Sequence, residues 1–176
     1  MAEGFRRTKL SSIPEQIWIL RVKYRLMSSP MAIENNSIAD VSIIMPAYNA
    51  ATTIVRAVMS AVNQTLRPKE IIVCDDGSAD DTVKIFQNLG AEINGVRLLL
   101  TTQPNKGAGA ARNRAISAAS SEWLAFLDAD DEWLPEKLEA SFNAIESGTY
   151  TLIAHDYLQV SPDGSEIRVE CARRFR

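Results

Sequence analysis

The sequence predicts an α/β fold, a doubly wound and mostly parallel sheet with helices on both faces. The main observation is that short apolar runs alternate with longer stretches of helical spacing from Val41 onward. This alternation is typical of parallel sheets whose connecting helices cover both faces. Composition agrees, because 176 residues with 46% hydrophobic and 23% charged content suit one folded domain with one core.

Each predicted element has its own local signal. The apolar runs at 41–45, 71–74, 96–101 and 122–127 are short and bounded by turn residues, so we expect strands there. We expect helices at 50–63, 80–89, 107–119 and 134–146. Beyond them, 150–160 and 165–170 flank the turn Ser161-Pro162-Asp163-Gly164 and predict a hairpin. The sheet would be incomplete at this C-terminal edge, which a further C-terminal portion, a partner chain or a second copy is expected to cover.

Residues 1–40 differ from the rest, with six basic and four acidic side chains. A basic helix over 14–27 would suit the surface of an anionic membrane, although its apolar face is poorly defined. We therefore expect a disordered or loosely docked leader at 1–40, followed by one domain at 41–176. A chain that begins at Met31 should then be as stable as the full chain.

Charge and composition argue against a nucleic-acid partner and against a membrane-spanning segment, and they bear on where the protein is located. A net charge of −3 is too mild to favour nucleic acid, and no apolar run approaches the roughly 20 residues of a membrane span. The two cysteines, Cys74 and Cys171, have neither metal-ligand spacing nor a disulfide framework. We expect a cytoplasmic protein, with peripheral contact at the inner face of the cell membrane left open by the basic leader.

Polar or small residues follow each predicted strand, at the point where it ends. The exits are Pro46-Ala47-Tyr48-Asn49, Asp75-Asp76-Gly77-Ser78 and Gln103-Pro104-Asn105-Lys106-Gly107. In a doubly wound sheet these exits converge on one ligand crevice. An Asp can accept from a base or ribose, and Arg112 can face phosphate, so the set suggests a nucleotide. Each residue also has a structural reading, such as a turn at Asp76, a helix cap at Asn49 or a solvated Arg112.

The fourth strand ends in a run of acids, with Asp128, Asp130 and Asp131 within four residues. Three neighbouring carboxylates repel one another, and a hard divalent cation with oxygen ligands would relieve that repulsion. The alternative is helix capping, in which Asp130 or Asp131 stabilises the first turn of the following helix. The short pattern alone leaves both readings open.

Taken together, these blocks resemble family 2 glycosyltransferases of the GT-A fold. The matching motifs are Pro-Ala-Tyr-Asn, Val-Cys-Asp-Asp-Gly-Ser, Asn-Lys-Gly-Ala-Gly-Ala-Ala-Arg-Asn and Phe-Leu-Asp-Ala-Asp-Asp, in family-like order over about 41–157. Within the family, the similarity is to bacterial enzymes of surface polysaccharide or exopolysaccharide synthesis. The resemblance implies that Pro46, Ala47, Tyr48 and Asn49 line the nucleotide pocket. It further implies base contact for Asp76, a place near the nucleotide for Arg112, ribose or water contacts for Asp128, and Mn²⁺ or Mg²⁺ ligation for Asp130.

The resemblance also implies a reaction, an inverting and metal-dependent sugar transfer. The donor would be a nucleoside-diphosphate sugar and the acceptor a hydroxyl of a glycan or a lipid-linked molecule, as in polysaccharide or glycoconjugate biosynthesis. In the family a carboxylate base lies well downstream, but the 46 residues after Asp130 contain no block that matches it. The general base is thus unidentified, the C-terminal acceptor half is expected to be missing, and His155 is expected to be structural. The alternative is a nucleotide-binding module with weak transfer that acts through a partner chain; a nucleotidyltransferase is disfavoured because no Gly-rich, Lys-containing phosphate loop follows the first strand.

Overall fold

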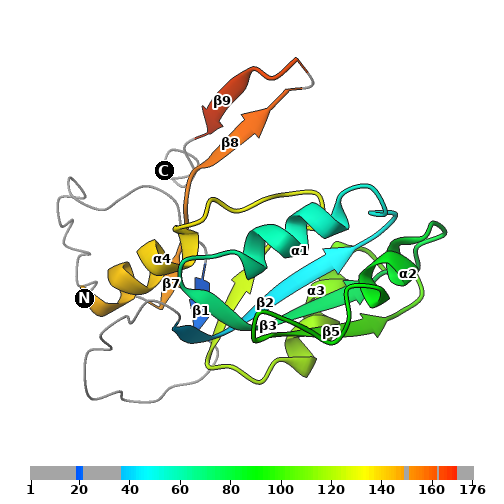
Figure 1. Cartoon of the computed structure of the whole chain (residues 1–176), viewed down its shortest axis with the longest axis horizontal. Coiled ribbons are helices and arrows are strands. Elements are labelled where there is room, and N and C mark those ends of the chain that lie inside the picture. The colour runs from blue at the N-terminus through cyan, green and yellow to red at the C-terminus, as the bar shows by residue number, and fades with distance from the viewer. Residues whose placement is uncertain (1–18, 22–36, 149–150, 162, 170–176) are drawn as a thin grey trace, which may run out of the picture.

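A computed structural model describes residues 19–21, 37–148, 151–161 and 163–169. Within these residues, seven strands form one sheet in the order β4-β5-β3-β2-β6-β1-β7 (Figure 1). Its centre is parallel and consists of β5 (Val96–Thr102), β3 (Arg67–Asp75), β2 (Ile38–Ala47) and β6 (Trp123–Phe126). Antiparallel strands flank it, with β4 (Glu92–Ile93) on β5 and β1 (Ile19–Arg21) between β6 and β7 (Leu152–Ile153). The predicted mostly parallel α/β sheet is confirmed.

Alternation along the strands divides the core into two layers. Ile43 of β2 pairs with Ile71 and packs on one face, whereas Ile44 pairs with Ile72 and packs on the other. The first face is covered by α1 (Ile54–Val62), α2 (Thr82–Gln87) and α4 (Lys137–Glu146), and the second by α3 (Ala108–Ala118). Helices therefore cover both faces, as the sequence predicts.

The helices follow from the residues that face the sheet. In α1 the buried side chains recur every three or four positions, which gives one continuous apolar face; they are Ile54, Ala57, Val58, Ala61 and Val62. In α3 the buried positions are Ala111 and Ala115. Side chains this small allow the backbone of α3 to lie close to the sheet, which brings the first turns of α3 near the strand ends.

Several boundaries differ from the sequence-based expectation. Strand β2 begins at Ile38, before the expected domain start at Val41. Residues Ile19–Arg21 pair within the sheet, so a helix over 14–27 is wrong at these three positions; the rest of that range lies outside the described residues. The expected strand at 150–160 is instead two, β7 and β8 (Tyr157–Val160), and β8 pairs with β9 (Glu166–Val169) in a separate hairpin that projects from the body (Figure 1).

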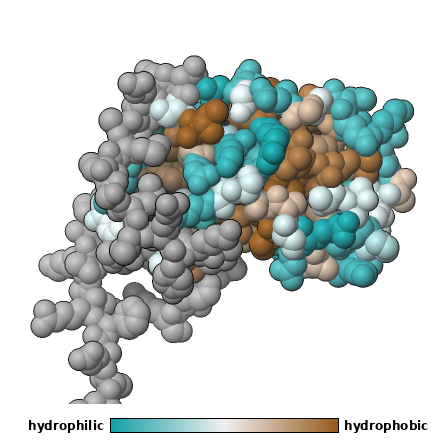
Figure 2. All heavy atoms as spheres, turned by 90° about the horizontal axis from the view of Figure 1, so that it is seen from below, coloured by the Kyte–Doolittle hydropathy of each residue, from teal (hydrophilic) through white to brown (hydrophobic). Residues whose placement is uncertain are grey.

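The surface is mixed in character. On the side shown in Figure 2, hydrophilic residues surround patches of apolar surface, as is usual for folded proteins. Across the described residues, every helix is too short or too polar to cross a membrane.

Candidate functional site

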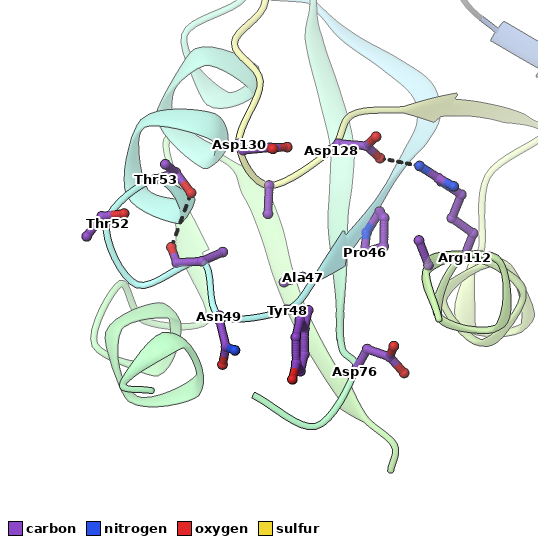
Figure 3. A pocket seen from close by; sticks show the side chains of 13 residues that line it. Pro46, Ala47, Tyr48, Asn49, Thr52, Thr53, Asp76, Arg112, Asp128 and Asp130 are labelled. Carbon is purple, nitrogen blue, oxygen red and sulfur yellow. Dashed lines mark hydrogen bonds and ion pairs between the residues drawn. The ribbon is translucent and has the colours of Figure 1, made fainter. Parts of the chain in front are cut away.

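A cavity of about 320 Å³ opens at the carboxyl ends of the parallel strands (Figure 3). Its walls bring together all eight side chains that the sequence analysis assigns to the site, Pro46, Ala47, Tyr48, Asn49, Asp76, Arg112, Asp128 and Asp130. They come from the end of β2, the turn after β3, helix α3 and the loop after β6. The chain proceeds from β2 to β3 on one side, whereas β6 returns to the other side of β2. The cavity thus lies where the strand order reverses, the usual ligand crevice of an open α/β sheet.

The β2–α1 loop forms one wall and is held by the β3–α2 loop. The Asn49 side chain accepts a hydrogen bond from the Ala79 N–H at 2.9 Å, and the Asn49 N–H donates to Ser78 Oγ at 2.9 Å. The Ala50 N–H donates to Thr82 Oγ1 at 2.8 Å. Asn49 does not cap α1, whose N-cap position is Thr53. Asn49 therefore fixes the backbone of this wall, in the left-handed region at φ 50°.

Tyr48 is the exposed aromatic group of the site. Its side chain lies on the same wall and is 54% exposed. An exposed ring at a cavity rim offers a flat apolar face to a planar ligand.

Asp76 is buried and accepts three hydrogen bonds. Its Oδ1 accepts from Gln103 Nε2 at 2.7 Å and from the Lys106 N–H at 2.9 Å, while Oδ2 accepts from the Gly107 N–H at 2.8 Å. The bond from Gln103, with those from the two backbone groups, lowers the pKa of Asp76 below its ordinary value. Asp76 is thus an anionic acceptor that also holds the β5–α3 loop. A carboxylate has about four acceptor positions, so one remains for a ligand.

Arg112 and Asp128 form an ion pair across the cavity. Arg112 lies one helical turn after Ala108 on α3, so both face the cavity. Its Nη2 lies 2.5 Å from Asp128 Oδ1, and the two side chains are 34% and 44% exposed (Figure 3). The pair is therefore accessible from the cavity.

Asp130 lines the cavity and is exposed. Within the described ranges, its carboxylate makes no hydrogen bond or ion pair. Asp131 lies outside the cavity wall and is exposed as a whole residue; partial desolvation of its carboxyl, together with the charges of Asp130 and Asp128, raises its pKa. Helix capping by Asp130 or Asp131 is wrong, because α4 begins at Lys137 and its N-cap is Glu136.

The donor set is compatible with a divalent cation shared with a ligand. The described residues contain no cluster of three or more His, Cys, Asp or Glu side chains that would hold a metal alone. Mg²⁺ and similar ions are often bound by one or two carboxylates together with water and the phosphates of a substrate. Asp130, exposed at the cavity and without a competing partner, fits that arrangement.

Five further wall residues escaped the sequence analysis, namely Ala50, Thr52, Thr53, Ala108 and Ala129. The alanines carry no chemical signal, and their small size is what leaves space. Thr52 and Thr53 lie three and four positions after Asn49, the last residue of the Pro-Ala-Tyr-Asn block, and that position was the signal available. Thr53 Oγ1 donates to the Ala50 carbonyl at 3.3 Å, so Thr53 also closes the start of α1.

Asp156 and His155, which follow β7, lie away from this cavity wall. Asp156 and Arg168 form an ion pair on the hairpin side of the molecule, with 3.1 Å between Asp156 Oδ2 and Arg168 Nη2. Burial lowers the pKa of His155 to about 4, and its Nδ1 lies 2.7 Å from the Asp156 carbonyl oxygen. A histidine that remains neutral and half-buried here is consistent with the structural role expected for it.

Comparison with known proteins gives a consistent family. The model described as "Glycosyl transferase family 2" matches residues 42–170. The chain is 40% identical over 118 residues to the UDP-Glc:alpha-D-GlcNAc-diphosphoundecaprenol beta-1,3-glucosyltransferase WfgD of Escherichia coli, a match that covers 66% of this chain and 45% of WfgD. Further relatives are named for bacterial polysaccharide biosynthesis. The chain thus spans less than half the length of WfgD.

Solved structures agree with the fold. S. aureus TarS 1–349 in complex with UDP-GlcNAc has a TM-score of 0.55 and 31% identity, over 61% of this chain and 31% of TarS. The mannosyltransferase PcManGT from Pyrobaculum calidifontis, in complex with GDP-Man and Mn2+, has a TM-score of 0.52 and 26% identity, over 61% of this chain and 31% of PcManGT. The predicted GT-A fold is confirmed, and since the family match extends over well more than half of the chain, this protein belongs to glycosyl transferase family 2.

Proposed function

We propose that this protein transfers a sugar from a nucleoside-diphosphate sugar to a hydroxyl of a glycan or lipid-linked acceptor, with inversion and with a divalent cation. The observation that carries the proposal is the convergence of all eight predicted residues on one cavity at the strand reversal. The names of relatives support the substrate class, because WfgD is named for UDP-Glc and a diphosphoundecaprenol acceptor. Polysaccharide or glycoconjugate biosynthesis is the proposed context.

The donor's nucleotide would occupy the wall built by β2 and its loop. Tyr48 offers an aromatic face to the base, and Asp76 an anionic acceptor for a base N–H. Pro46 and Ala47 shape the floor. Asp128 would contact the ribose or a water, and Arg112 the phosphates, for which a planar guanidinium is suited. A base with a ring N–H donor, such as uracil, fits an acceptor of this kind.

The leaving group of such a transfer is a nucleoside diphosphate, on which negative charge develops. Asp130 would hold Mn²⁺ or Mg²⁺ beside it, and the bound cation would supply Lewis-acid stabilisation of that charge. The cation in the PcManGT complex supports the choice of metal. The chain's own contribution at this point is the free carboxylate of Asp130 at the cavity.

A second candidate is a nucleotide-binding module that acts through a partner chain. Transfer needs a base for the acceptor hydroxyl, and loss of a positioned base typically costs about 10²–10⁴-fold in rate. The acids of the cavity wall are Asp76, Asp128 and Asp130. Asp76 is bonded to the β5–α3 loop, Asp128 is assigned to the ribose or a water, and Asp130 is assigned to the cation. No acid of this wall is left to act as the base, and this favours the second candidate.

The proposal is tested by calorimetry of UDP binding with and without Mn²⁺. The wild-type chain should bind UDP more tightly with Mn²⁺, and Asp130→Ala should abolish the difference. Asp131→Ala is the matched control, because Asp131 is the adjacent aspartate but lies outside the cavity wall. Equal metal dependence in wild type and Asp130→Ala would contradict the metal assignment.

The same protein, incubated with labelled nucleotide sugars and a membrane extract as acceptor source, decides between the two candidates. Turnover of about 1 s⁻¹ or more is ordinary for an enzyme and would exclude the module. Binding of UDP without transfer would instead favour the module.

A further inference from the structure

The positive charge next to the loop that carries Asp128 and Asp130 belongs to a side chain of the protein itself, the guanidinium of Arg112. Arg112 Nη2 is 2.5 Å from Asp128 Oδ1, and both groups line the cavity with Asp130. We propose that Arg112 is a resident counter-ion, which occupies Asp128 and keeps the divalent cation from binding until a nucleoside diphosphate draws the guanidinium away. This inference rests on the proposed function of the same cavity and adds an order of binding to it.

The charges explain why a counter-ion would matter here. Asp128 and Asp130 are separated by a single residue, and both reach the cavity. Two neighbouring carboxylates attract a divalent cation much more strongly than one. Because Arg112 neutralises Asp128, Asp130 is the member of this pair of aspartates that makes no hydrogen bond or ion pair within the described part of the chain. Metal without nucleotide should therefore bind weakly.

A diphosphate is suited to take Arg112 from Asp128. The guanidinium presents a planar fork of N–H donors that matches either a carboxylate or a phosphate. Arg112 is 34% exposed on the cavity side of α3, so a ligand can reach it without unfolding the helix. Once Arg112 faces the phosphates, Asp128 and Asp130 are both available to the ribose and the cation. Nucleotide and metal would then each strengthen the binding of the other, as linkage requires.

The experiment measures Mn²⁺ binding by calorimetry in the absence of nucleotide. Arg112→Ala should bind Mn²⁺ about tenfold more tightly than wild type. A positive charge within about 4–6 Å of a carboxylate changes its proton affinity by at least about tenfold, and we take this lower limit for Mn²⁺ because both side chains are partly exposed. The matched control is Arg56→Ala, which removes one positive charge from the same region. Arg56 Nη1 pairs with Glu132 Oε1 at 3.3 Å, and neither residue lines the cavity. Arg56→Ala should leave the affinity for Mn²⁺ at the wild-type value.

Two further variants make the result specific. Arg112→Lys keeps the charge and should bind Mn²⁺ as weakly as wild type, whereas Arg112→Gln should reproduce the gain. In the double variant Arg112→Ala/Asp128→Asn the gain should disappear. Arg112→Ala should also bind UDP more weakly, the opposite direction to its effect on metal. A loss of folding would weaken the binding of both Mn²⁺ and UDP. Opposite changes in the two affinities therefore identify the exchange of Arg112 between Asp128 and the diphosphate.

Arg112→Ala that binds Mn²⁺ no more tightly than Arg56→Ala would overturn the inference. A gain that persists in the double variant would also overturn it, because Asp128 would not be the group released. The measurement contains no nucleotide. A failure of wild type to bind UDP would therefore count against the proposed function, whereas the Mn²⁺ series alone decides the role of Arg112.

Discussion

Gly77 is the residue at which the two loops on the Asp76 side of the cavity meet. Its φ is +75°, a conformation that L side chains rarely adopt. A Cβ placed on Gly77 would lie 2.9 Å from the Asn105 backbone N and 3.3 Å from the Gln103 carbonyl oxygen. The neighbouring Asp76 carboxylate accepts hydrogen bonds from the Lys106 and Gly107 N–H groups of the same loop. Gly77 and Asp76 together hold the loop that leads into α3, and this fixes the position of the first turns of α3, which carry Arg112.

We predict that Gly77→Ala destabilises the fold through both backbone strain and a steric clash. Gly90→Ala is the matched control, because Gly90 has a similar φ of +89° but open space around it. Gly90→Ala should cost about 1–2 kcal/mol for the left-handed conformation, and Gly77→Ala at least about 1 kcal/mol more for the clash. Urea unfolding measures the difference. Equal losses in the two variants would show that the 103–107 loop moves aside freely.

At this scale the sequence predicted eight of the thirteen residues that line the cavity, but not what these residues contact. The eight wall residues follow from motifs, each a short local pattern. The bonds of Asp76 reach Lys106 and Gly107, about 30 positions away, and Arg112 meets Asp128 across 16 positions. Such partners depend on how α3 packs on the sheet, which no local pattern specifies. The short acidic pattern left helix capping by Asp130 open for the same reason.

At the scale of elements, Glu70 joins the strands at the end of the sheet opposite the cavity. Its side chain is fully buried on β3. It accepts from Ser42 Oγ of β2 at 2.6 Å, from the Ser120 N–H at 2.8 Å and from the guanidinium of Arg97 on β5. Burial raises the pKa of this carboxyl, but the hydrogen bonds outweigh burial and the net pKa is lowered from its ordinary value of 4.5.

We predict that Glu70→Gln destabilises the protein by about 1–3 kcal/mol at pH 7, because buried donors lose their anionic partner. The folded pKa is below the unfolded one, so the ionised carboxyl stabilises the fold above about pH 4.5. That contribution is lost as the pH falls through the folded pKa. Urea unfolding from pH 7 downward should therefore show the gap between wild type and Glu70→Gln narrowing.

The control for this series is Glu92→Gln, which changes an exposed glutamate of β4. It should leave the free energy of unfolding close to wild type at each pH. A gap between wild type and Glu70→Gln that stays constant with pH would contradict the role of the Glu70 charge.

The start of α4 differs from the prediction because another part of the chain forms hydrogen bonds with the backbone carbonyls at that point. Helix α4 was expected from Leu134 but begins at Lys137. The carbonyl of Leu134 accepts from Gln64 Nε2 at 2.8 Å, and that of Pro135 accepts from the Thr65 N–H at 2.9 Å. These bonds tie the segment to the loop after α1. The strongly periodic α1 and the apolar central strands were found because burial alone determines them.

At the scale of the whole molecule, the sheet is built from three distant parts of the sequence. Strand β1 pairs Leu20 with Leu124 of β6 on one side and with Leu152 of β7 on the other. The sequence could not predict this, because three residues carry too little pattern and long-range pairing is not a local property. The hairpin β8–β9, which follows β7 in the chain, carries exposed apolar side chains, including Tyr157, Val160 and Ile167. The expectation that a partner or further chain covers it stays a prediction.

The last prediction concerns the leader, for which sequence and structure point in different directions. If the pairing of β1 contributes to stability, a chain that begins at Met31 loses β1 and leaves an edge of β6 unpaired. Its thermal midpoint should then fall by at least about 2–4 °C, which corresponds to roughly 1 kcal/mol in a protein of this size. Leu20→Pro in the full chain should produce a similar fall, because proline removes a backbone donor from a strand paired on both sides. A chain from Met31 that melts at the same temperature as the full chain would instead make the leader dispensable, and the fold would then depend on residues from Ile38 onward.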